Sequence, residues 1–561
     1  MSLRLTGLVL AGILLLVFAV PSPVAAAPAP PPGVGPWVVR AAFTDRAQVN
    51  RLAAEREPWQ VNYAERYIVI DVDRAGWQAL VDLGFDPEVD AERTAEMLRP
   101  HVKLPGQIEG IPGFPCYRTV EETYASAQAL ATNFPNLATW TDIGDSWEKV
   151  NPGGNAGYDI MVLKLTNSAI PGPKPKLIIN AEIHAREYTT AELVTRFGEY
   201  LVNNYGTDPD ATWILDNQEV HLVLMANPDG RKHAEAGQLW RKNTHPVSCA
   251  DPNSWGIDLN RNYPYNWGCC GGSSGSGCSE TFRGPSPASE PETQAVRDYV
   301  LAEIPDYGDP QSGPIPADAA GMFMDIHSAA GLVLWPWGYT TTVAPNGIQM
   351  QTLGRKFAYF NTYFPEQSIY LYVTDGTTID FGYGDRGVAS FTFELGTEFF
   401  QQCSYFENVI VPGNMPALVY AARVTRAPYM QPAGPESLSV ATLPSGTVPS
   451  GQPLVVNATV NDSRFNNQNG TEPTQPIAAA EVYVDVPPWS PGAAPMALAA
   501  ADGNFNTPVE AVTGTLPTAG WPLGKHTLFV RGRDTLDNWG PVGAVFIDVV
   551  VPVELLGFTV E

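Results

Sequence analysis

His184 and Glu187 are the first pair of residues in this sequence whose types and spacing could do chemistry. They lie three residues apart in the stretch Leu177-Ile-Ile-Asn-Ala-Glu-Ile-His184-Ala-Arg-Glu187. The apolar run predicts a short buried strand followed by a helix, with both side chains at the junction. An imidazole and a carboxylate at this spacing can bind one metal ion. Because one such pair can occur by chance in a long chain, the hypothesis depends on partners elsewhere.

His327 is the candidate third ligand. It directly follows the predicted strand Met322-Phe-Met-Asp-Ile, and the carboxyl ends of strands in open α/β sheets are where ligands bind. Together with His184 and Glu187 it would form a His2Glu set that leaves one tetrahedral position open for water. His221, in contrast, lies inside an apolar strand and is interpreted as a core residue.

A hydrolytic site also needs a base and cationic groups. Glu394 lies in the predicted strand Ala389–Leu395, where burial raises a carboxyl pKa and a nearby cation lowers it. Arg241 and the pair Asn260-Arg261 lie in irregular segments. Guanidinium groups can bind a carboxylate bidentately or stabilise a developing oxyanion. Alone, each arginine would be interpreted as a solvated loop charge.

Composition restricts the class of protein. The chain has 561 residues, of which 44% are hydrophobic and 16% charged, and its formal net charge is -26. This length predicts several globular domains. The negative charge argues against nucleic acid and anionic membranes as partners and favours a soluble monomer.

The first 26 residues are typical of a signal peptide, with Arg4, an apolar run from Leu8 to Val20 and a small-residue site ending at Ala26. We therefore expect secretion, and no second apolar run is long enough to cross a membrane. In an exported protein, six cysteines predict three disulfides, with fifteen connectivities open. None forms a CxxC pair typical of a structural zinc site.

Alternating patterns predict three units after the signal peptide. Residues 27–112 are a small α/β unit, 113–430 an α/β domain, and 431–561 a linker and an immunoglobulin-like or fibronectin-like β-sandwich. A polar segment containing Arg99 and Lys103 is open to a trypsin-like activating protease, which predicts that the first unit is a cleaved pro-segment. A module that stays attached is the alternative.

With these residues assembled, the chain from Pro115 to Tyr429 resembles the zinc metallocarboxypeptidases, which include pancreatic carboxypeptidases A and B. It is most similar to the secreted bacterial members related to carboxypeptidase T. The resemblance is carried by His184-Ala-Arg-Glu187, Trp240-Arg241-Lys242, Asn260-Arg261, His327-Ser, Tyr372-Val-Thr-Asp-Gly-Thr-Thr-Ile379-Asp and Phe393-Glu394-Leu.

The resemblance implies a mixed central sheet flanked by helices and one Zn²⁺ per chain, held by His184, Glu187 and His327. It also implies a role for each remaining site residue: Glu394 is the catalytic base, Arg241 polarises the scissile carbonyl, Asn260 and Arg261 bind the terminal carboxylate, Tyr372 caps the substrate, and Arg186 is a further substrate-binding residue. Ile379 at the pocket floor favours apolar or aromatic C-terminal residues, although nearby Asp375 leaves basic ones open.

The resemblance further implies an inhibitory pro-segment and a disulfide between Cys249 and Cys278. It leaves the pairing of the adjacent Cys269 and Cys270 open. It also leaves open whether a structural Ca²⁺ ion binds.

Three alternatives remain. Gly271-Gly-Ser273-Ser-Gly275 fits the serine-hydrolase pattern, but that pattern requires a strand before it and a helix after it. A non-catalytic protein that binds through its β-sandwich is a second alternative. The third is a cell-wall peptidase of the same fold, against which Arg261 weighs as a carboxylate-binding residue.

Overall fold

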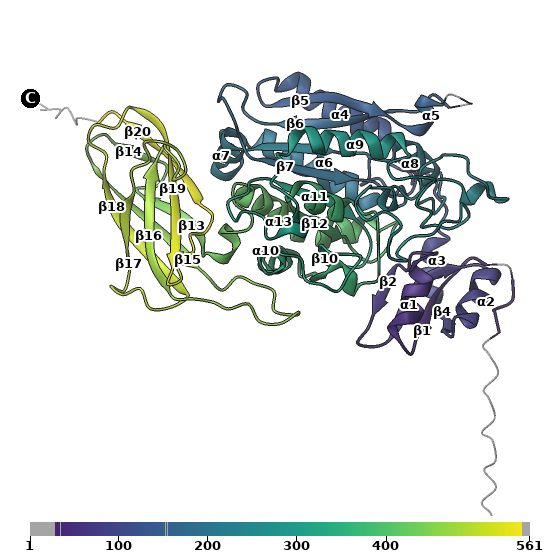
Figure 1. The fold of residues 1–561 in the computed structure, drawn as a ribbon. Helices are drawn as coiled ribbons and strands as arrows, with labels where there is room; N and C mark the ends of the chain where they lie inside the picture. The colour runs from purple at the N-terminus through teal and green to yellow at the C-terminus, as the bar shows by residue number, and fades with distance from the viewer. Residues whose placement is uncertain (1–28, 34, 152, 154, 553–561) are drawn as a thin grey trace, which may run out of the picture.

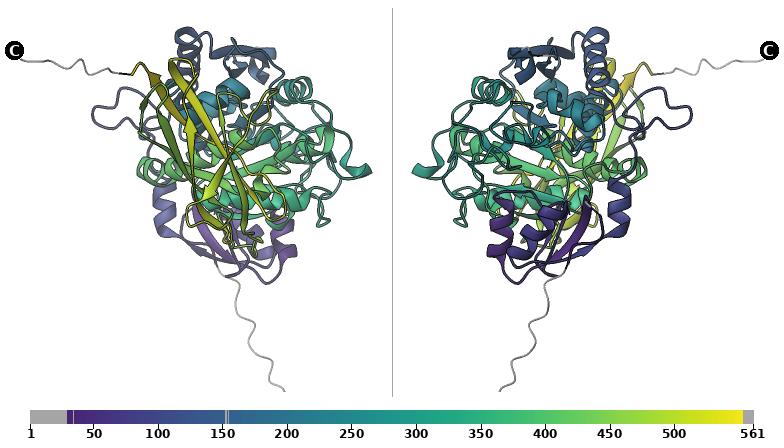
Figure 2. Two further views of the ribbon diagram at one scale, coloured as in Figure 1. Left: turned by 90° about the vertical axis from the view of Figure 1, so that its left-hand side faces the viewer. Right: turned by 90° about the vertical axis from the view of Figure 1, so that its right-hand side faces the viewer.

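The computed structural model describes residues 29–33, 35–151, 153 and 155–552. The predicted signal peptide lies outside these residues. The described chain forms three units in a row, with the small N-terminal unit and the C-terminal sandwich at opposite ends of the central unit (Figure 1). The end-on views in Figure 2 show each of the two outer units in front of the central one.

The N-terminal unit is a four-stranded sheet of order β2-β3-β1-β4 with three helices. Asp90 caps α3 by accepting a hydrogen bond from the Arg93 amide, and the Thr94 hydroxyl is buried against β1. The chain is therefore helical up to Met97 and becomes irregular from Leu98 onward, in the segment that contains Arg99 and Lys103. The elements are β1 (Trp37–Ala42), α1 (Arg46–Ala53), β2 (Gln60–Asn62), β3 (Tyr67–Val72), α2 (Arg74–Asp82), β4 (Asp86–Val89) and α3 (Ala91–Met97).

The central unit contains an eight-stranded mixed sheet of order β11-β10-β12-β9-β7-β8-β6-β5, as expected. The inner strands β12, β9, β7 and β8 are parallel to one another. The strands are β5 (Ala138–Asp145), β6 (Asp159–Leu165), β7 (Lys176–Ala181), β8 (Glu219–Val223), β9 (Met322–His327), β10 (Leu332–Trp335), β11 (Phe364–Gln367) and β12 (Ala389–Glu394).

Helices flank this sheet and bury its apolar strands (Figure 1). Every residue of β9 is buried, which explains why this strand reads as a continuous apolar run interrupted only by Asp325 and His327. The longer helices are α4 (Val120–Asn133), α6 (Tyr188–Asn203), α7 (Pro209–Asn217), α8 (Pro228–Glu235), α9 (Pro291–Glu303), α10 (Gly347–Asn361), α11 (Thr378–Arg386) and α13 (Val411–Val424).

The C-terminal unit has eight strands in the order β13-β15-β18-β17-β16-β19-β20-β14. Alternate side chains of both halves, such as Val456 on β15 and Val530 on β19, enter one buried cluster, as in a sandwich. The strands are β13 (Glu436–Leu443), β14 (Thr447–Pro449), β15 (Pro453–Asn461), β16 (Ile477–Val484), β17 (Met496–Ala500), β18 (Val509–Pro517), β19 (Gly524–Asp534) and β20 (Gly543–Val550).

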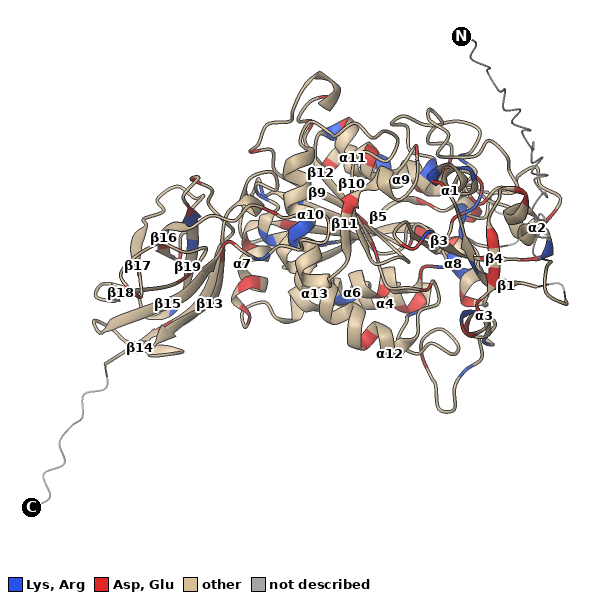
Figure 3. Cartoon of the chain, turned by 90° about the horizontal axis from the view of Figure 1, so that it is seen from below, with Lys and Arg blue, Asp and Glu red and all other residues tan. Residues whose placement is uncertain are grey.

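The sandwich is joined to the central unit through a buried polar contact. The ammonium group of Lys356 on α10 lies 3.3 Å from the carboxylate of Glu436, which also binds Arg464 at 3.0 Å. A second contact joins Trp213 of the central unit to Trp489 of the sandwich, whose rings lie 5.6 Å apart. Acidic residues are spread over all three units (Figure 3), in line with the net charge of -26.

All six cysteines form disulfides, as predicted for their even number. Cys249 pairs with Cys278 as the resemblance implies, and Cys116 pairs with Cys403. The pairing left open is settled because the neighbours Cys269 and Cys270 bond to each other. In the part of the chain that the structure describes, no helix has the length and hydropathy of a membrane span.

Candidate active site

Three of the predicted residues converge where β7 and β9 end. His184 lies between β7 and α6, Glu187 precedes the first residue of α6, and His327 ends β9, the neighbour of β7. His184 Nδ1 is 2.7 Å from Glu187 Oε1 and 3.1 Å from His327 Nδ1, and His327 Nδ1 is 3.3 Å from Glu187 Oε2. Ligand atoms of a tetrahedral zinc ion are about 3.3 Å apart, so this buried donor set fits zinc.

Two aspartates fix the orientation of the imidazoles. Asp258 Oδ1 lies 3.1 Å from His184 Nε2, and Asp325 Oδ2 lies 3.0 Å from His327 Nε2. A proton on each Nε2 leaves each Nδ1 lone pair directed at the shared position, as in carboxylate–histidine–zinc arrangements. The three ligand residues therefore form a site that is oriented before any ion binds.

Glu394 ends β12 directly beside this donor set. Its backbone is in register with His327 on one side and with Leu332 of β10 on the other. Burial removes water from the Glu394 carboxyl and raises its pKa well above the usual value. The positive charge of His327 opposes this shift. A carboxylate with a raised pKa beside a metal site has the properties of a general base.

Arg241 contacts both His184 and Asp258. Its Nη2 is 2.9 Å from Asp258 Oδ2, and its Nη1 is 3.1 Å from His184 Nδ1. The same Nη1 also binds Glu57, which comes from the segment between α1 and β2 of the N-terminal unit. Glu57 Oε2 further accepts a hydrogen bond from buried Arg186 at 3.1 Å. One acidic side chain thus binds the guanidinium groups of Arg241 and Arg186, two of the three arginines predicted for the site.

Asn260 and Arg261 lie in a 3-10 turn, η2 (Leu259–Arg261), next to the metal-binding position. The Asn260 side-chain nitrogen is 3.1 Å from His327 Nε2, and its oxygen accepts from the Thr378 amide at 2.9 Å. The Arg261 guanidinium donates to the carbonyl oxygens of Gly272 and Asn260. These bonds hold the pair at the start of α11, where Ile379 is buried.

Tyr372 is buried in the same region and joins the N-terminal unit to the site. It packs in one apolar cluster with residues of that unit. Burial is the main cause that raises its pKa well above the usual value, and the charge of Glu57 adds to this effect. All ten predicted site residues therefore lie around one position in the central unit.

The serine pattern does not form a nucleophile. Ser273 lies in an irregular loop with neither strand nor helix beside it, and its hydroxyl donates to Asp375. Asp375 is fully buried and accepts two more hydrogen bonds, from the amides of Cys270 at 3.1 Å and Gly272 at 2.9 Å. The structural context that this pattern requires is absent from these described residues.

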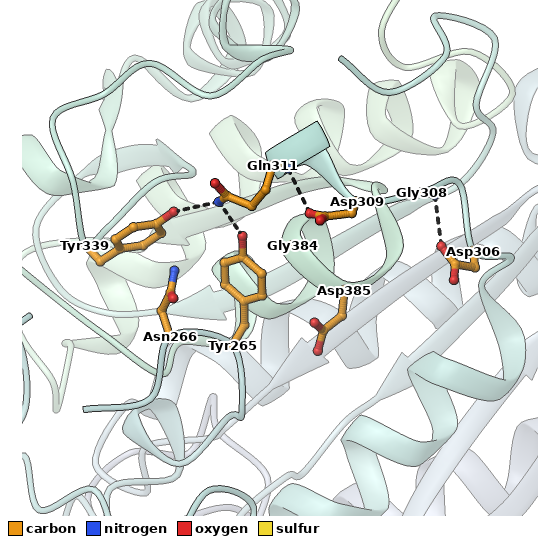
Figure 4. A pocket seen from close by; sticks show the side chains of 9 residues that line it. All are labelled: Tyr265, Asn266, Asp306, Gly308, Asp309, Gln311, Tyr339, Gly384 and Asp385. Carbon is orange, nitrogen blue, oxygen red and sulfur yellow. Dashed lines mark hydrogen bonds between the residues drawn. The ribbon is translucent and has the colours of Figure 1, made fainter. Parts of the chain in front are cut away.

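Two other polar sites do not resemble a metal centre. Glu219, His221 and Glu303 are close together, but Lys164 and Lys176 already neutralise the two carboxylates. A second region is a pocket of about 600 Å³ that contains Asp306, Asp309 and Asp385 (Figure 4). Among the described residues these aspartates do not form a set with ligand atoms within 4.8 Å of one another.

Comparison with known proteins agrees with this geometry. Residues 123–411 match the Peptidase_M14 zinc carboxypeptidase family. The chain is 32% identical over 359 residues to a zinc carboxypeptidase of Saccharothrix mutabilis subsp. capreolus, covering 62% of this chain and 74% of that protein. It is also 32% identical over 290 residues to rat carboxypeptidase A1, covering 50% of this chain and 62% of that protein. The chain belongs to the zinc carboxypeptidase family.

Solved structures show the same fold. Thrombin activatable fibrinolysis inhibitor matches with a TM-score of 0.55 and 20% identity, over 70% of this chain and 98% of that one. Carboxypeptidase A from Helicoverpa armigera matches with a TM-score of 0.55 and 22% identity, over 69% of this chain and 98% of that one. The expected zinc metallocarboxypeptidase class and α/β fold are therefore confirmed.

Sequence reasoning missed three residues that contact the site. Asp258 and Asp325 each lie two positions before a predicted site residue, Asn260 or His327, so an aspartate close to a candidate ligand was an available signal. Glu57 gave no such signal, because its place on Arg241 depends on how the N-terminal unit packs against the central unit.

Proposed function

We propose that this protein is a secreted, monomeric zinc carboxypeptidase that removes the last residue of peptides and proteins. The observation that carries the proposal is the His184, Glu187 and His327 donor set with Glu394 and Arg241 beside it. Three disulfides and the net charge of -26 are consistent with a secreted, self-repelling protein.

The roles of the residues follow from their positions. When bound, zinc supplies a Lewis acid that lowers the pKa of water and polarises a carbonyl oxygen. Glu394 takes a proton from the attacking water and returns it to the leaving amine. Arg241, held by Asp258, donates to the oxygen on which negative charge develops.

Restriction to the last residue comes from the groups around η2. We assign the terminal carboxylate to Asn260 and Arg261, because a guanidinium group matches carboxylate geometry. Tyr372 would cover the bound residue. A peptide without a free carboxylate would lack this anchor, and its scissile bond would not be positioned.

The pocket for the last side chain favours apolar or aromatic residues. Ile379 is buried beside Thr378, whose amide contacts Asn260. Asp375, the acid that left basic residues open, already accepts three hydrogen bonds from the loop at 270–273. A carboxylate with its acceptor positions filled in this way is a poor partner for a basic side chain.

Residues 27–112 are proposed to be an inhibitory pro-segment. Glu57 occupies Arg241 and Arg186, where the substrate's carbonyl and backbone would bind. The ring of Trp59 lies 5.2 Å from that of Phe399, whose ring centre is 4.1 Å from the Arg186 guanidinium carbon. Arg99 and Lys103 are exposed in the irregular segment after α3, where an activating protease could cut.

The test uses peptides that differ only in the last residue. The full chain is folded, cut with trypsin and incubated with each peptide, with and without a zinc chelator. We expect the cut protein to release phenylalanine or leucine faster than lysine, and the chelator to stop the release. Activity that survives the chelator but is lost with a serine-directed inhibitor would overturn the proposal.

A further inference from the structure

A second pocket, of about 550 Å³, lies where the three units meet. Strands β10 and β11 of the central unit contribute Trp335, Phe364 and Glu366 to it. Asn469, in the segment between β15 and β16, lines it from the sandwich, and Arg46 and Tyr63 line it from the N-terminal unit. In Figure 1 the β15–β16 segment reaches along the central unit toward the N-terminal unit.

The side chain of Arg46 lines this pocket, and its contacts show that the pocket can bind a guanidinium group. Its guanidinium carbon lies 4.8 Å from the ring centre of Tyr63 and 5.7 Å from that of Tyr370. It also donates a hydrogen bond to the Ile369 carbonyl oxygen. Aromatic rings and a carbonyl oxygen are the groups that bind a guanidinium ion.

Glu366 is the acidic group of the pocket. Among the described residues, none donates a hydrogen bond to its carboxylate and none forms an ion pair with it within 4.0 Å. Burial raises the Glu366 pKa to about 7, and the charge of Arg46 opposes this shift. Removing the N-terminal unit takes Arg46 away and leaves a half-buried acid without a cation.

The rest of the pocket suits a long side chain with a charged tip. Val343 and Ile348 are 59% and 72% exposed, and Phe364 is 37% exposed, so an aliphatic stem can lie against them. Removing the N-terminal unit also uncovers Leu334 and Leu371, which lead from this pocket toward Tyr372.

The pocket lies within reach of a substrate. Glu394 is in register with Leu332, and Leu332 with Phe364. Phe364 is therefore two strand spacings from Glu394, and Glu366 lies two residues further along β11. Together these separations place the Glu366 backbone about 12 Å from that of Glu394. An extended peptide rises about 3.3 Å per residue, so it covers this distance in roughly three to four residues.

We propose that, once the pro-segment is removed, the pocket formed by Glu366, Tyr370 and the Ile369 carbonyl binds an arginine or lysine side chain of the substrate, three to five residues before the scissile bond. Arg46 occupies the same position in the uncut chain. The inference rests on the carboxypeptidase function proposed above for its substrate, but the binding itself does not require turnover.

Binding is therefore measured on trypsin-cut protein that carries Glu394→Gln. Calorimetry compares peptides with a single arginine at the third, fourth or fifth position before the last bond with peptides carrying norleucine there. We expect arginine at one of these positions to lower the Kd about tenfold, and Glu366→Gln to remove the difference. Equal Kd values for the arginine and norleucine peptides would overturn the proposal.

Turnover gives an independent readout. With Glu394 intact, a blocked dipeptide is too short to reach the pocket, so Glu366→Gln should leave its kcat/KM unchanged while removing the arginine preference on long peptides. Glu407→Gln is the matched control, because Glu407 pairs with Arg196 on the surface. If the unmutated cut protein does not cleave the dipeptide, the proposed function is wrong. If the arginine preference survives Glu366→Gln, the proposed pocket is wrong.

Discussion

At the scale of single residues, the site combines a ligand set with groups that orient it. The sequence was enough to propose His184, Glu187, His327 and Glu394, because few residue types can act as zinc ligands or as a general base. Asp325 is less conspicuous. Its carboxylate accepts from His327 Nε2 at 3.0 Å, from Thr378 Oγ1 at 2.6 Å and from Asn180 Nδ2 at 2.9 Å.

Replacing Asp325 by asparagine tests its positioning role. The asparagine side chain would keep the shape but lose the charged acceptor, so we expect zinc affinity to fall about 10- to 100-fold. Competition with a chromophoric chelator measures the zinc Kd. Asp306→Asn is the control, because Asp306 is exposed and distant from the ligand set. An unchanged Kd in Asp325→Asn would show that His327 is held by other contacts.

At the scale of elements, long periodic segments were predictable and short ones were not. Helical patterns in the sequence predict helices around Val120 to Asn133 and around Pro291 to Glu303, and the alternating run from Tyr67 to Val72 predicts a strand. The elements α4, α9 and β3 have these bounds. Strands β10 and β11 were missed because each has only four residues, too few for a clear alternating pattern. The edge strand β11 forms one wall of the pocket at Glu366, so this pocket could not be inferred from the sequence.

The first turn of α9 carries a buried acid that should make stability depend on pH. Glu292 is 1% exposed, and burial, with the nearby Glu290 charge, raises its pKa to about 8. A carboxyl whose pKa is higher in the folded state contributes stability below its unfolded value of 4.5, and this contribution is lost as pH rises toward 8.

Glu292→Gln removes this titration while keeping an oxygen for the Trp147 amide. The free energy of unfolding of the variant, relative to that of the unmutated chain, should therefore increase as pH rises from 5 to 8. The increase is about 1.4 kcal/mol per pH unit at most. Urea unfolding at several pH values measures the difference. A difference that stays constant across this range would contradict the assignment.

At the scale of the whole molecule, the N-terminal unit packs against the candidate site through Glu57, and the sandwich lies at the opposite end of the central unit. The sequence patterns predict three units but not the contacts between them. Glu57 binds Arg241 and Arg186, and Lys356 binds Glu436, only because separate units pack together. Such contacts join residues 80 to 184 positions apart and leave no local pattern.

The Glu57 contact predicts the behaviour of the uncut chain. Glu57→Gln removes the charge that occupies both arginines, so we expect the uncut variant to hydrolyse a blocked dipeptide at least about tenfold faster than the uncut parent. Glu65→Gln is the control, because Glu65 pairs with exposed Arg40 on the same unit. Equal rates for Glu57→Gln and the parent would mean that steric cover alone closes the cleft.

The most direct test of the central claim is the turnover number of Glu394→Gln. The cut variant and the cut parent are compared on one peptide with a free terminal carboxylate, with bound zinc measured in both. We expect full zinc occupancy and a kcat that falls by about 10²- to 10⁴-fold, because the general base is lost while His184, Glu187 and His327 remain. A zinc-loaded variant with a near-normal kcat would contradict the account.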